Sequence, residues 1–247
     1  MASVLVFGAS STVAMAVARR CAARGDRLAL VGRNPERITA LAAELGEAVA
    51  LTRSGVDLTD RSLHDALIAD AEQALGGLDV ALVAHGWLPD QLRTESDVEE
   101  AIRAFEVNLL SAVSLVARLA NRLEARGAGH LAVITSVAGM RGRPRNYTYG
   151  AAKGGLSLYL QGVRSRLYRS GVQVHDLRPG PILTPMTEGH PVNPLFASPE
   201  RVAAGILAAI DGGWPVRYLP WYWWPIMQVV VRLPEPIFQR LGFLSGR

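Results

Sequence analysis

Lys153 is the only lysine among the chain's 26 lysine and arginine residues, and it follows Tyr149 by four positions. Arginine can replace lysine wherever only a positive charge is needed, but arginine stays protonated and offers no titratable primary amine. A lysine beside a tyrosine favours the tyrosinate and lowers the phenol pKa from its usual value of about 10. The pair therefore predicts a tyrosine that exchanges a proton near neutral pH, unless an arginine-rich composition left the last lysine there by chance.

A turn of small residues, Gly8 to Ala14, follows an apolar run and opens a helical one. At such a turn, backbone N–H groups and the helix dipole can bind the pyrophosphate of a dinucleotide. Only the first position of a Gly-x-x-x-Gly-x-Gly pattern is glycine here, because Thr12 and Ala14 occupy the other two. A plain connection is therefore the alternative, and the candidate cofactor-binding residues are Gly8, Ser10, Ser11, Thr12 and Val13.

The second apolar run ends in Gly32-Arg33 and lacks the acidic residue that binds a ribose 2′-hydroxyl. The Arg33 guanidinium instead suits a 2′-phosphate, which favours NADP(H), with NAD(H) as the alternative cofactor. A solvated arginine would explain Arg33 without any cofactor. After the third apolar run, Asp57 and Leu58 lie where side chains could meet the adenine.

Apolar runs alternate with helical segments along the whole sequence, which is the pattern of βαβ units in a parallel sheet. We therefore predict an α/β fold, a Rossmann-type doubly wound sheet of seven parallel strands flanked by helices. The predicted strands are residues 4–7, 28–31, 49–52, 80–84, 131–135, 172–177 and 217–219. The predicted helices are residues 13–24, 35–45, 61–75, 98–126, 148–170 and 199–210.

Size and composition predict one domain over residues 1–247, since 247 residues with 49% apolar side chains can bury a single large core. The lone Cys21 excludes an internal disulfide and a cysteine-based metal cluster, and no metal site is expected. No basic leader precedes the first strand, so we expect a cytoplasmic protein. Most of the net charge of +4 lies in residues 214–247 among tryptophans, which argues against a nucleic-acid partner.

Four features together resemble the short-chain dehydrogenase/reductase family: Ser136, the Tyr149-x-x-x-Lys153 motif, Asn108 and the glycine-poor turn at Gly8. Ser136 precedes Tyr149 by thirteen residues, the usual separation in that family, and the resemblance covers nearly the whole chain. It implies an NAD(P)H-dependent enzyme that reduces a ketone to a secondary alcohol. A non-catalytic dinucleotide-binding protein is the rival interpretation, and in either case we expect a homo-oligomer.

The resemblance assigns a role to each matching residue. Tyr149 would give a proton to the carbonyl oxygen, and Ser136 would donate a hydrogen bond to that oxygen as charge develops there. Lys153 would hold the nicotinamide ribose and lower the pKa of Tyr149, while Asn108 would anchor a water in the proton relay. The segment that would frame the nicotinamide carboxamide contains Pro179, Gly180, Ile182 and Thr184.

Two departures from the family pattern concern the cofactor. Ala84-His85-Gly86 replaces the family's Asn-Ala-Gly after the fourth strand, and the turn glycines are reduced to Gly8. Neither change removes a reacting group, so Ala84, His85 and Gly86 remain candidates for cofactor binding. A lone histidine beside a cofactor more often packs or forms a hydrogen bond than reacts, and we expect the same of His85.

Two further segments are candidates for substrate contact. Four prolines between Pro181 and Pro194, together with His190, suggest a mobile lid over a cleft, or else an inert surface loop. Four of the five tryptophans lie in residues 214–247, and the apolar run 221–231 is too short to span a bilayer but can lie in its interface. A subunit contact or a wall of the substrate pocket would explain this aromatic tail equally well.

Three segments resemble more narrowly the reductases that act on a decaprenylphosphoryl keto-pentose: residues 84–91, residues 195–201 and the aromatic tail. That group completes a 2′-epimerisation that makes the arabinose donor for cell-wall arabinan. The resemblance implies a lipid-linked keto substrate, a flavin oxidase partner that supplies it, and peripheral contact of residues 214–247 with the inner face of the plasma membrane. The alternative is a soluble carbonyl or acyl-chain ketone reductase that acts on a small molecule.

Overall fold

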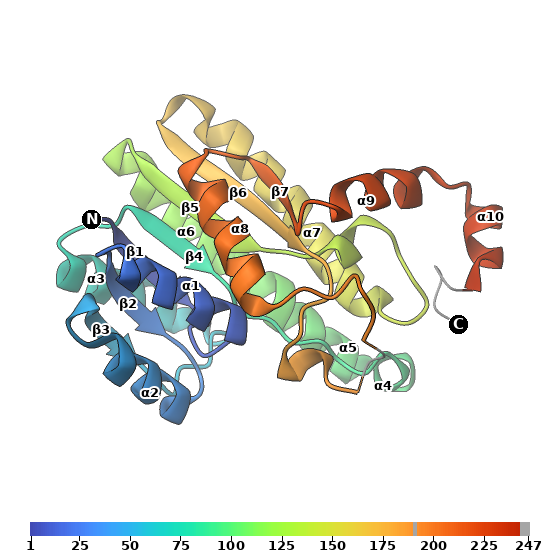
Figure 1. The fold of residues 1–247 in the computed structure, drawn as a ribbon, viewed down its shortest axis with the longest axis horizontal. Coiled ribbons are helices and arrows are strands. Elements are labelled where there is room, and N and C mark those ends of the chain that lie inside the picture. The colour runs from blue at the N-terminus through green and yellow to red at the C-terminus, as the bar shows by residue number, and fades with distance from the viewer. Residues whose placement is uncertain (190–191, 243–247) are drawn as a thin grey trace.

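Seven strands lie side by side in one parallel sheet, in the order β3-β2-β1-β4-β5-β6-β7 (Figure 1). They are β1 (Ser3–Phe7), β2 (Arg27–Val31), β3 (Val49–Arg53), β4 (Val80–Val83), β5 (Gly129–Ile134), β6 (Val172–Pro179) and β7 (Val216–Leu219). The structure, a computed structural model, describes residues 1–189 and 192–242, so His190 of the predicted lid and residues 243–247 of the predicted tail lie outside the described residues. The predicted doubly wound, seven-stranded parallel sheet is confirmed.

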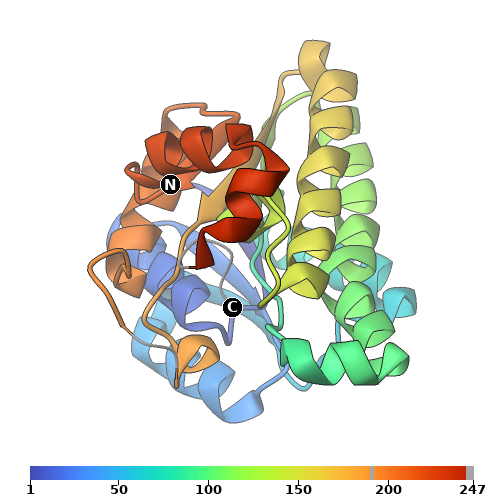
Figure 2. The same ribbon diagram turned by 90° about the vertical axis from the view of Figure 1, so that its right-hand side faces the viewer.

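Apolar side chains on both faces of the strands bury the sheet between two layers of helices. In β1, Val4 and Val6 belong to one core cluster, while Leu5 and Phe7 belong to another. The first cluster contains α1 (Thr12–Ala23), α2 (Pro35–Leu45) and α8 (Pro199–Asp211). The second contains α3 (His64–Leu75), α6 (Ser111–Arg126) and α7 (Tyr147–Arg166). Figure 2 shows α6 and α7, in green and yellow, on the opposite side of the sheet from α1 and α8.

The order of the strands reverses on either side of β1. Phe7 pairs with Val31 of β2 on one side and with Val83 of β4 on the other. In doubly wound sheets this reversal leaves a crevice beyond the carboxyl ends of the strands, where ligands bind. The segments that leave the strands at this edge carry Gly8, Arg33, Asp57, His85, Ser136 and Gly180.

The predicted helix over residues 98–126 is interrupted. α5 (Val98–Phe105) passes into α6 through a π-helical turn (Glu106–Leu110) that contains Asn108. The Asn108 side chain donates to the Ala104 carbonyl, four residues earlier, at 2.9 Å and so competes for a helical acceptor. Hydrophobic periodicity does not reveal a widened turn of this kind, because the pattern resumes on the same face after it.

Other helix boundaries also differ from the prediction. The segments 61–75 and 148–170 contain α3 and α7, but they begin or end in 3-10 turns at Arg61–Leu63 and Leu167–Arg169. The short helix α4 (Gln91–Ser96) was not predicted, although Asp90 caps it by accepting a hydrogen bond from Leu92 N at 2.9 Å.

The predicted aromatic tail, residues 214–247, begins inside the sheet as β7 and continues as α9 (Trp223–Arg232) and α10 (Glu235–Arg240). Sequence analysis did not predict these two helices. Trp223, Met227 and Val230 form the buried stripe of α9. Pro225 is tolerated because it lies in the first turn of α9, where backbone N–H groups have no helical acceptor. Among the described residues, no helix has both the length and the hydropathy to cross a membrane.

Candidate active site

α7 lies directly against the turn that follows β5, Val137–Met140, and this contact brings the predicted catalytic residues together. A methyl group on Gly139 of the turn would lie 2.5 Å from the backbone nitrogen of Gly154 in α7, so no side chain fits between them. The close approach places Ser136 beside Tyr149, with which its side chain forms a hydrogen bond. The structure therefore joins two residues that lie thirteen positions apart in the sequence.

Lys153 is buried one helical turn after Tyr149, with 3% of its surface exposed. Its Nζ atom donates a hydrogen bond to the carbonyl oxygen of Ile134 at 3.0 Å and lies 5.9 Å from the centre of the Tyr149 ring. An ammonium group has three donors, and within the described chain this carbonyl is the one acceptor bound to it. The remaining donors are available to a ligand in the crevice.

Burial changes the proton affinity of both residues. It raises the pKa of Tyr149 to about 12, because it disfavours the phenolate, while the hydrogen bond from Ser136 acts in the opposite direction. It lowers the pKa of Lys153 to about 8, against the influence of the Asp176 carboxylate. In this structure the ammonium group is bound to Ile134 and the net shift of the Tyr149 pKa is upward, so the lowering of that pKa by Lys153 stays a prediction. A phenol that is protonated at neutral pH suits a proton donor.

Asp176 on β6 is a fully buried carboxylate near Lys153. Thr135 donates a hydrogen bond to Asp176 Oδ1 at 2.5 Å, and Arg178 Nε donates to Oδ2 at 2.8 Å. Thr135 directly precedes Ser136, so the carboxylate also fixes the backbone that carries the serine. Asp176 thus combines a positioning role with a charge that favours the protonated form of Lys153.

The side chain of Asn108 binds only backbone groups. Its Nδ2 atom donates to the carbonyl oxygens of Trp87 at 2.8 Å and Ala104 at 2.9 Å, and its Oδ1 atom accepts from Trp87 N at 2.9 Å. Gly86 lies between Asn108 and Lys153, because a methyl group there would be 3.0 Å from Asn108 Oδ1 and 3.3 Å from Lys153 Nζ. Asn108 therefore holds the loop after β4 in place, and its role as a water anchor stays a prediction.

His85 presents a buried acceptor to the crevice. Its Nε2 atom lies 2.7 Å from Ser111 Oγ, which itself donates to the carbonyl oxygen of Val107 at 2.8 Å. A hydroxyl has only one hydrogen, so Nε2 carries the ring proton and Nδ1 is an acceptor. Burial, with a smaller effect from the charge of Lys153, lowers the pKa of His85 to about 3. Nδ1 is buried with no hydrogen-bond partner among the described residues, which suits a ligand hydroxyl rather than proton transfer.

The turn after β1 fits a pyrophosphate. Gly8 has a φ of +76°, and a methyl group there would lie 2.5 Å from the backbone nitrogen of His85, so only glycine fits. Ser11 caps α1 by accepting a hydrogen bond at 3.2 Å from the backbone N–H three residues later. The N–H groups of Thr12 and Val13, at the first two positions of α1, have no helical acceptor and are the groups that would bind a phosphate. Ser10 packs against Gly32 at the end of β2.

Arg33 and Asp57 line one depression of about 410 Å³ beside this turn. Asp57 accepts hydrogen bonds from the N and Oγ1 atoms of Thr59 at 2.9 and 2.8 Å, which lowers its pKa, with a smaller effect from the charge of Arg33. Arg33 is exposed and has no ion pair within residues 1–189 and 192–242. The two predicted residues are thus brought together at the end of the crevice where the adenosine would lie.

Two predicted cofactor-binding residues, Leu58 and Ala84, belong to the buried core clusters, so their side chains pack against the sheet. A residue that was not predicted, Arg37 of α2, reaches the turn instead. Its Nη2 atom donates to Thr12 Oγ1 at 3.3 Å, which places a second guanidinium at the adenosine end of the crevice.

The predicted nicotinamide frame lies beside Ser136. Ser136 Oγ is 3.5 Å from the carbonyl oxygen of Pro179. The indole of Trp223 packs on Gly180 so closely that a methyl group on this glycine would overlap it. Trp223 Nε1 is buried without a hydrogen-bond partner among the described residues. Ile182 forms an isolated bridge with Ala197, and Thr184 follows in the same loop.

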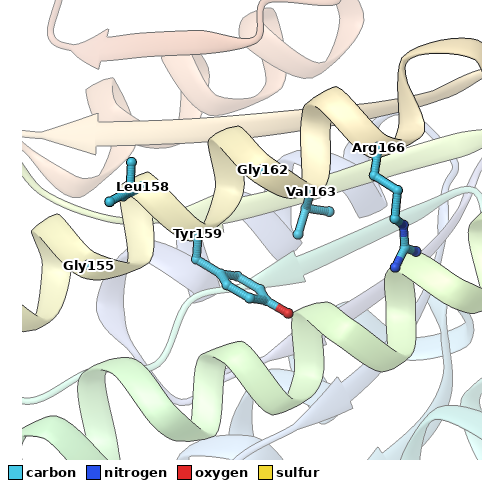
Figure 3. A pocket seen from close by; sticks show the side chains of 6 residues that line it. All are labelled: Gly155, Leu158, Tyr159, Gly162, Val163 and Arg166. Carbon is cyan, nitrogen blue, oxygen red and sulfur yellow. The ribbon is translucent and has the colours of Figure 1, made fainter.

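A groove of about 480 Å³ on the outer face of α7 contains none of these groups (Figure 3). It is lined by Gly155, Leu158, Tyr159, Gly162, Val163 and Arg166. Figure 3 shows Tyr159 and Arg166 directed toward the neighbouring helix α6. Lys153, by contrast, donates to the carbonyl oxygen of Ile134 in β5. The groove therefore does not belong to the candidate active site.

Asp176 and Arg37 belong to the site and were not predicted, whereas Trp223 was part of the aromatic tail for which a wall of the substrate pocket was one interpretation. Asp176 lies in β6, an interior strand that also carries Gln173, His175 and Arg178, and polar residues at such positions were a usable signal. Arg37 gave no comparable signal, because it reaches the turn after β1 from α2 through the packing of helices, which spacing along the chain does not describe.

Known proteins resemble this chain over the sheet and the site. The model of a family described as short chain dehydrogenase matches residues 2–193. An uncharacterized oxidoreductase of Mycobacterium tuberculosis is 36% identical over 242 residues, which are 97% of this chain and 97% of the relative. An uncharacterized oxidoreductase of Streptomyces coelicolor is 35% identical over 243 residues, 97% of this chain and 95% of the relative. The crystal structure of levodione reductase matches with a TM-score of 0.78 and 25% identity over 87% of this chain and 94% of that chain.

Asp176→Asn should lower the pKa of Lys153 below its value of about 8, because the variant removes the charge that favours the ammonium group. Lys153 is the only lysine, so a titration of lysine-labelled protein by NMR reports on it alone. Ser157→Ala is the matched control, since it removes a 3.3 Å hydrogen bond to Asp176 and leaves the charge. A lower melting temperature with an unchanged Lys153 titration would contradict the electrostatic role.

Proposed function

The chain belongs to the short chain dehydrogenase family and is an NAD(P)-dependent oxidoreductase, and we propose that it reduces a ketone to a secondary alcohol. The observation that carries the proposal is the arrangement of Ser136, Tyr149 and Lys153 around the end of β5, with Lys153 Nζ 3.0 Å from the carbonyl oxygen of Ile134. A bound nicotinamide cofactor supplies the hydride. The family membership and the likeness to levodione reductase support this direction of chemistry.

The protonation and hydrogen bonding of each catalytic side chain suit the reduction of a ketone. Tyr149, with its pKa raised to about 12, holds a proton at neutral pH and gives it to the carbonyl oxygen of the ketone. Ser136 is hydrogen-bonded to Tyr149 and stands where it can donate to the same oxygen as negative charge develops. Lys153 has free ammonium donors for the ribose hydroxyls of the cofactor, and its charge stabilises Tyr149 after the proton has left.

Tyr149→Phe should lower kcat by about 10²- to 10⁴-fold, because it removes the proton donor. The affinity for NADPH should stay within about twofold, since the variant keeps the ring and the Lys153 ammonium group. Turnover can be followed by NADPH absorbance with a panel of cyclic ketones that begins with levodione, and binding by NADPH fluorescence. Tyr147→Phe is the matched control, because Tyr147 lies two positions earlier and is 44% exposed. Undiminished turnover in Tyr149→Phe would rule out this mechanism.

NADP(H) is the cofactor that we propose. Two arginines support it, because Arg33 is exposed without an ion pair in the described chain and Arg37 reaches Thr12 from α2. Guanidinium groups bind phosphate through paired, charge-assisted hydrogen bonds, and Gly32 stands where an NAD-specific acid would bind the ribose 2′-hydroxyl. The buried acceptor His85 Nδ1 suits a cofactor hydroxyl and does not distinguish the two cofactors.

NADPH should raise the melting temperature of the protein more than NADH at equal concentration, because preferential binding stabilises the folded state in proportion to occupancy. Arg33→Asp should weaken NADPH binding by about 10- to 100-fold and leave NADH binding nearly unchanged. Arg169→Asp provides an equal change of charge at an exposed site away from the crevice. Stronger stabilisation of the wild-type protein by NADH would refute the preference.

A more specific candidate substrate is a ketose linked to a polyprenyl phosphate. It is supported by the position of α9, because the buried Trp223 of this helix packs on Gly180 while Trp221 and Trp224 are 65% and 57% exposed. Indole rings favour the depth of lipid headgroups, and Arg232 and Arg240 add positive charge beside them. A membrane bound through this surface would bring the head of a lipid-linked ketose to the active site, in keeping with the resemblance to reductases of decaprenylphosphoryl keto-pentose.

The double variant Trp221→Gln/Trp224→Gln should lose binding to anionic lipid vesicles in a flotation assay, whereas the wild-type chain floats. Substitution is preferable to deletion of residues 214–247, because that deletion would remove β7 and the buried stripe of α9. Leu158→Gln is the control, since Leu158 is 68% exposed on the outer face of α7. If the wild-type chain does not float, or all three proteins float equally, membrane contact through α9 is wrong.

A further inference from the structure

The loop between the turn after β5 and the start of α7 carries three arginines, Arg141, Arg143 and Arg145. Arg141 has a structural role, because its Nη2 atom lies 2.6 Å from Glu235 Oε2 and its Nη1 atom donates to the carbonyl oxygen of Leu233 at 2.9 Å. These contacts tie the loop to α9 and α10. The other two arginines have no ion pair within residues 1–189 and 192–242.

Arg143 is partly buried and has no ion pair among the described residues. Its Nε atom is inaccessible and has no hydrogen-bond partner among the described residues, and its Nη2 atom lies 3.6 Å from the sulfur of Met227. Burial lowers the pKa of Arg143, and the charge of Arg145 adds to that effect. A desolvated guanidinium with a thioether as its neighbour is unfavourable for folding, so its retention points to a ligand that neutralises it.

The surroundings of Arg143 belong to the active site. Arg143 precedes Tyr149 by six residues, and its carbonyl oxygen accepts a hydrogen bond from Asn146 N at 3.1 Å, just before α7 begins. Met227, which it contacts, lies one helical turn after Trp223 on the buried stripe of α9. Trp223 packs on Gly180 of the predicted nicotinamide frame, and its Nε1 atom is a second buried donor without a partner among the described residues.

We propose that Arg143, assisted by Trp223 Nε1, binds an oxyanion carried by the ketone substrate, either a carboxylate or a phosphate. The inference rests on the proposed ketone reduction at Tyr149 and names the class of ketone that the site accepts. Two unsatisfied donors lie on elements that border the active site, one on the loop before α7 and one on α9, and the described residues around Arg143 supply no carboxylate. The loop and α9 together then select an acidic ketone over a neutral one.

Binding to the NADP⁺-loaded protein, measured as a rise in melting temperature, tests this assignment without turnover. Two matched pairs of probes separate the sources of the anion: dihydroxyacetone phosphate against dihydroxyacetone, and 4-oxopentanoate against its methyl ester. In the wild-type protein, at least one anionic probe should bind more tightly than its neutral partner. Arg143→Gln should weaken binding of that probe by about 10- to 100-fold and leave the neutral partner unaffected. Arg143→Lys should restore part of the preference.

Arg145→Gln is the matched control, because it removes a charge from the same loop at an exposed position and should keep the preference. Without ligand, Arg143→Gln should melt at the same temperature as the wild-type protein or higher, since it removes an unpaired buried charge. A lower melting temperature, with the anion preference retained, would show a structural role and overturn the proposal, as would equal binding of the anionic and neutral probes. Binding of an anionic ketone that is not reduced would support the inference and contradict ketone reduction.

Discussion

The close packing of α7 on the turn after β5 is the contact on which the rest of the site depends. Gly139, Gly150 and Gly154 each lack room for a methyl group at this contact, so backbone meets backbone. The consequence is chemical, because the end of β5 supplies the Ile134 carbonyl and Ser136 while α7 supplies the phenol and the ammonium group. A displacement of one methyl diameter would separate Ser136 from Tyr149, and positioned proton transfer does not tolerate such a distance.

Buried charged groups influence the proton affinity of the catalytic residues. The pKa of Lys153 is about 8, because burial lowers it while the Asp176 carboxylate acts in the opposite direction. Arg178 Nη2 lies 2.6 Å from Asp176 Oδ2, and Tyr218 accepts a hydrogen bond from Arg178 Nη1 at 3.0 Å. A permanently charged guanidinium in place of Lys153 would remove this adjustment. The lysine at position 153 is therefore explained by the response of its pKa to burial as well as by the shape of its side chain.

Features that depend on contacts between residues close along the chain were easier to predict than features that depend on contacts between distant residues. The central strands were predictable, because burial on both faces makes such a strand a nearly continuous apolar run, as in β4. Ser136, Tyr149 and Lys153 were predictable as a motif, but the raised pKa of Tyr149 was not, since it depends chiefly on the burial of the phenol. The π turn at Asn108 and the packing of Trp223 on Gly180 arise from tertiary contacts. They leave no signal in the hydrophobic periodicity of the sequence.

α9 connects the reacting groups with the outside of the protein. Its buried stripe places Trp223 on Gly180 and Met227 on Arg143, so the helix forms a wall shared by the predicted nicotinamide frame and the proposed anion site. Its outer face exposes Trp224 to whatever lies beside the protein. Arg141 contacts Leu233 at the end of this helix and Glu235 at the start of α10, so the loop that carries Arg143 is tied to α9. A partner that binds the outer face of α9 would therefore contact the same helix that borders the substrate site.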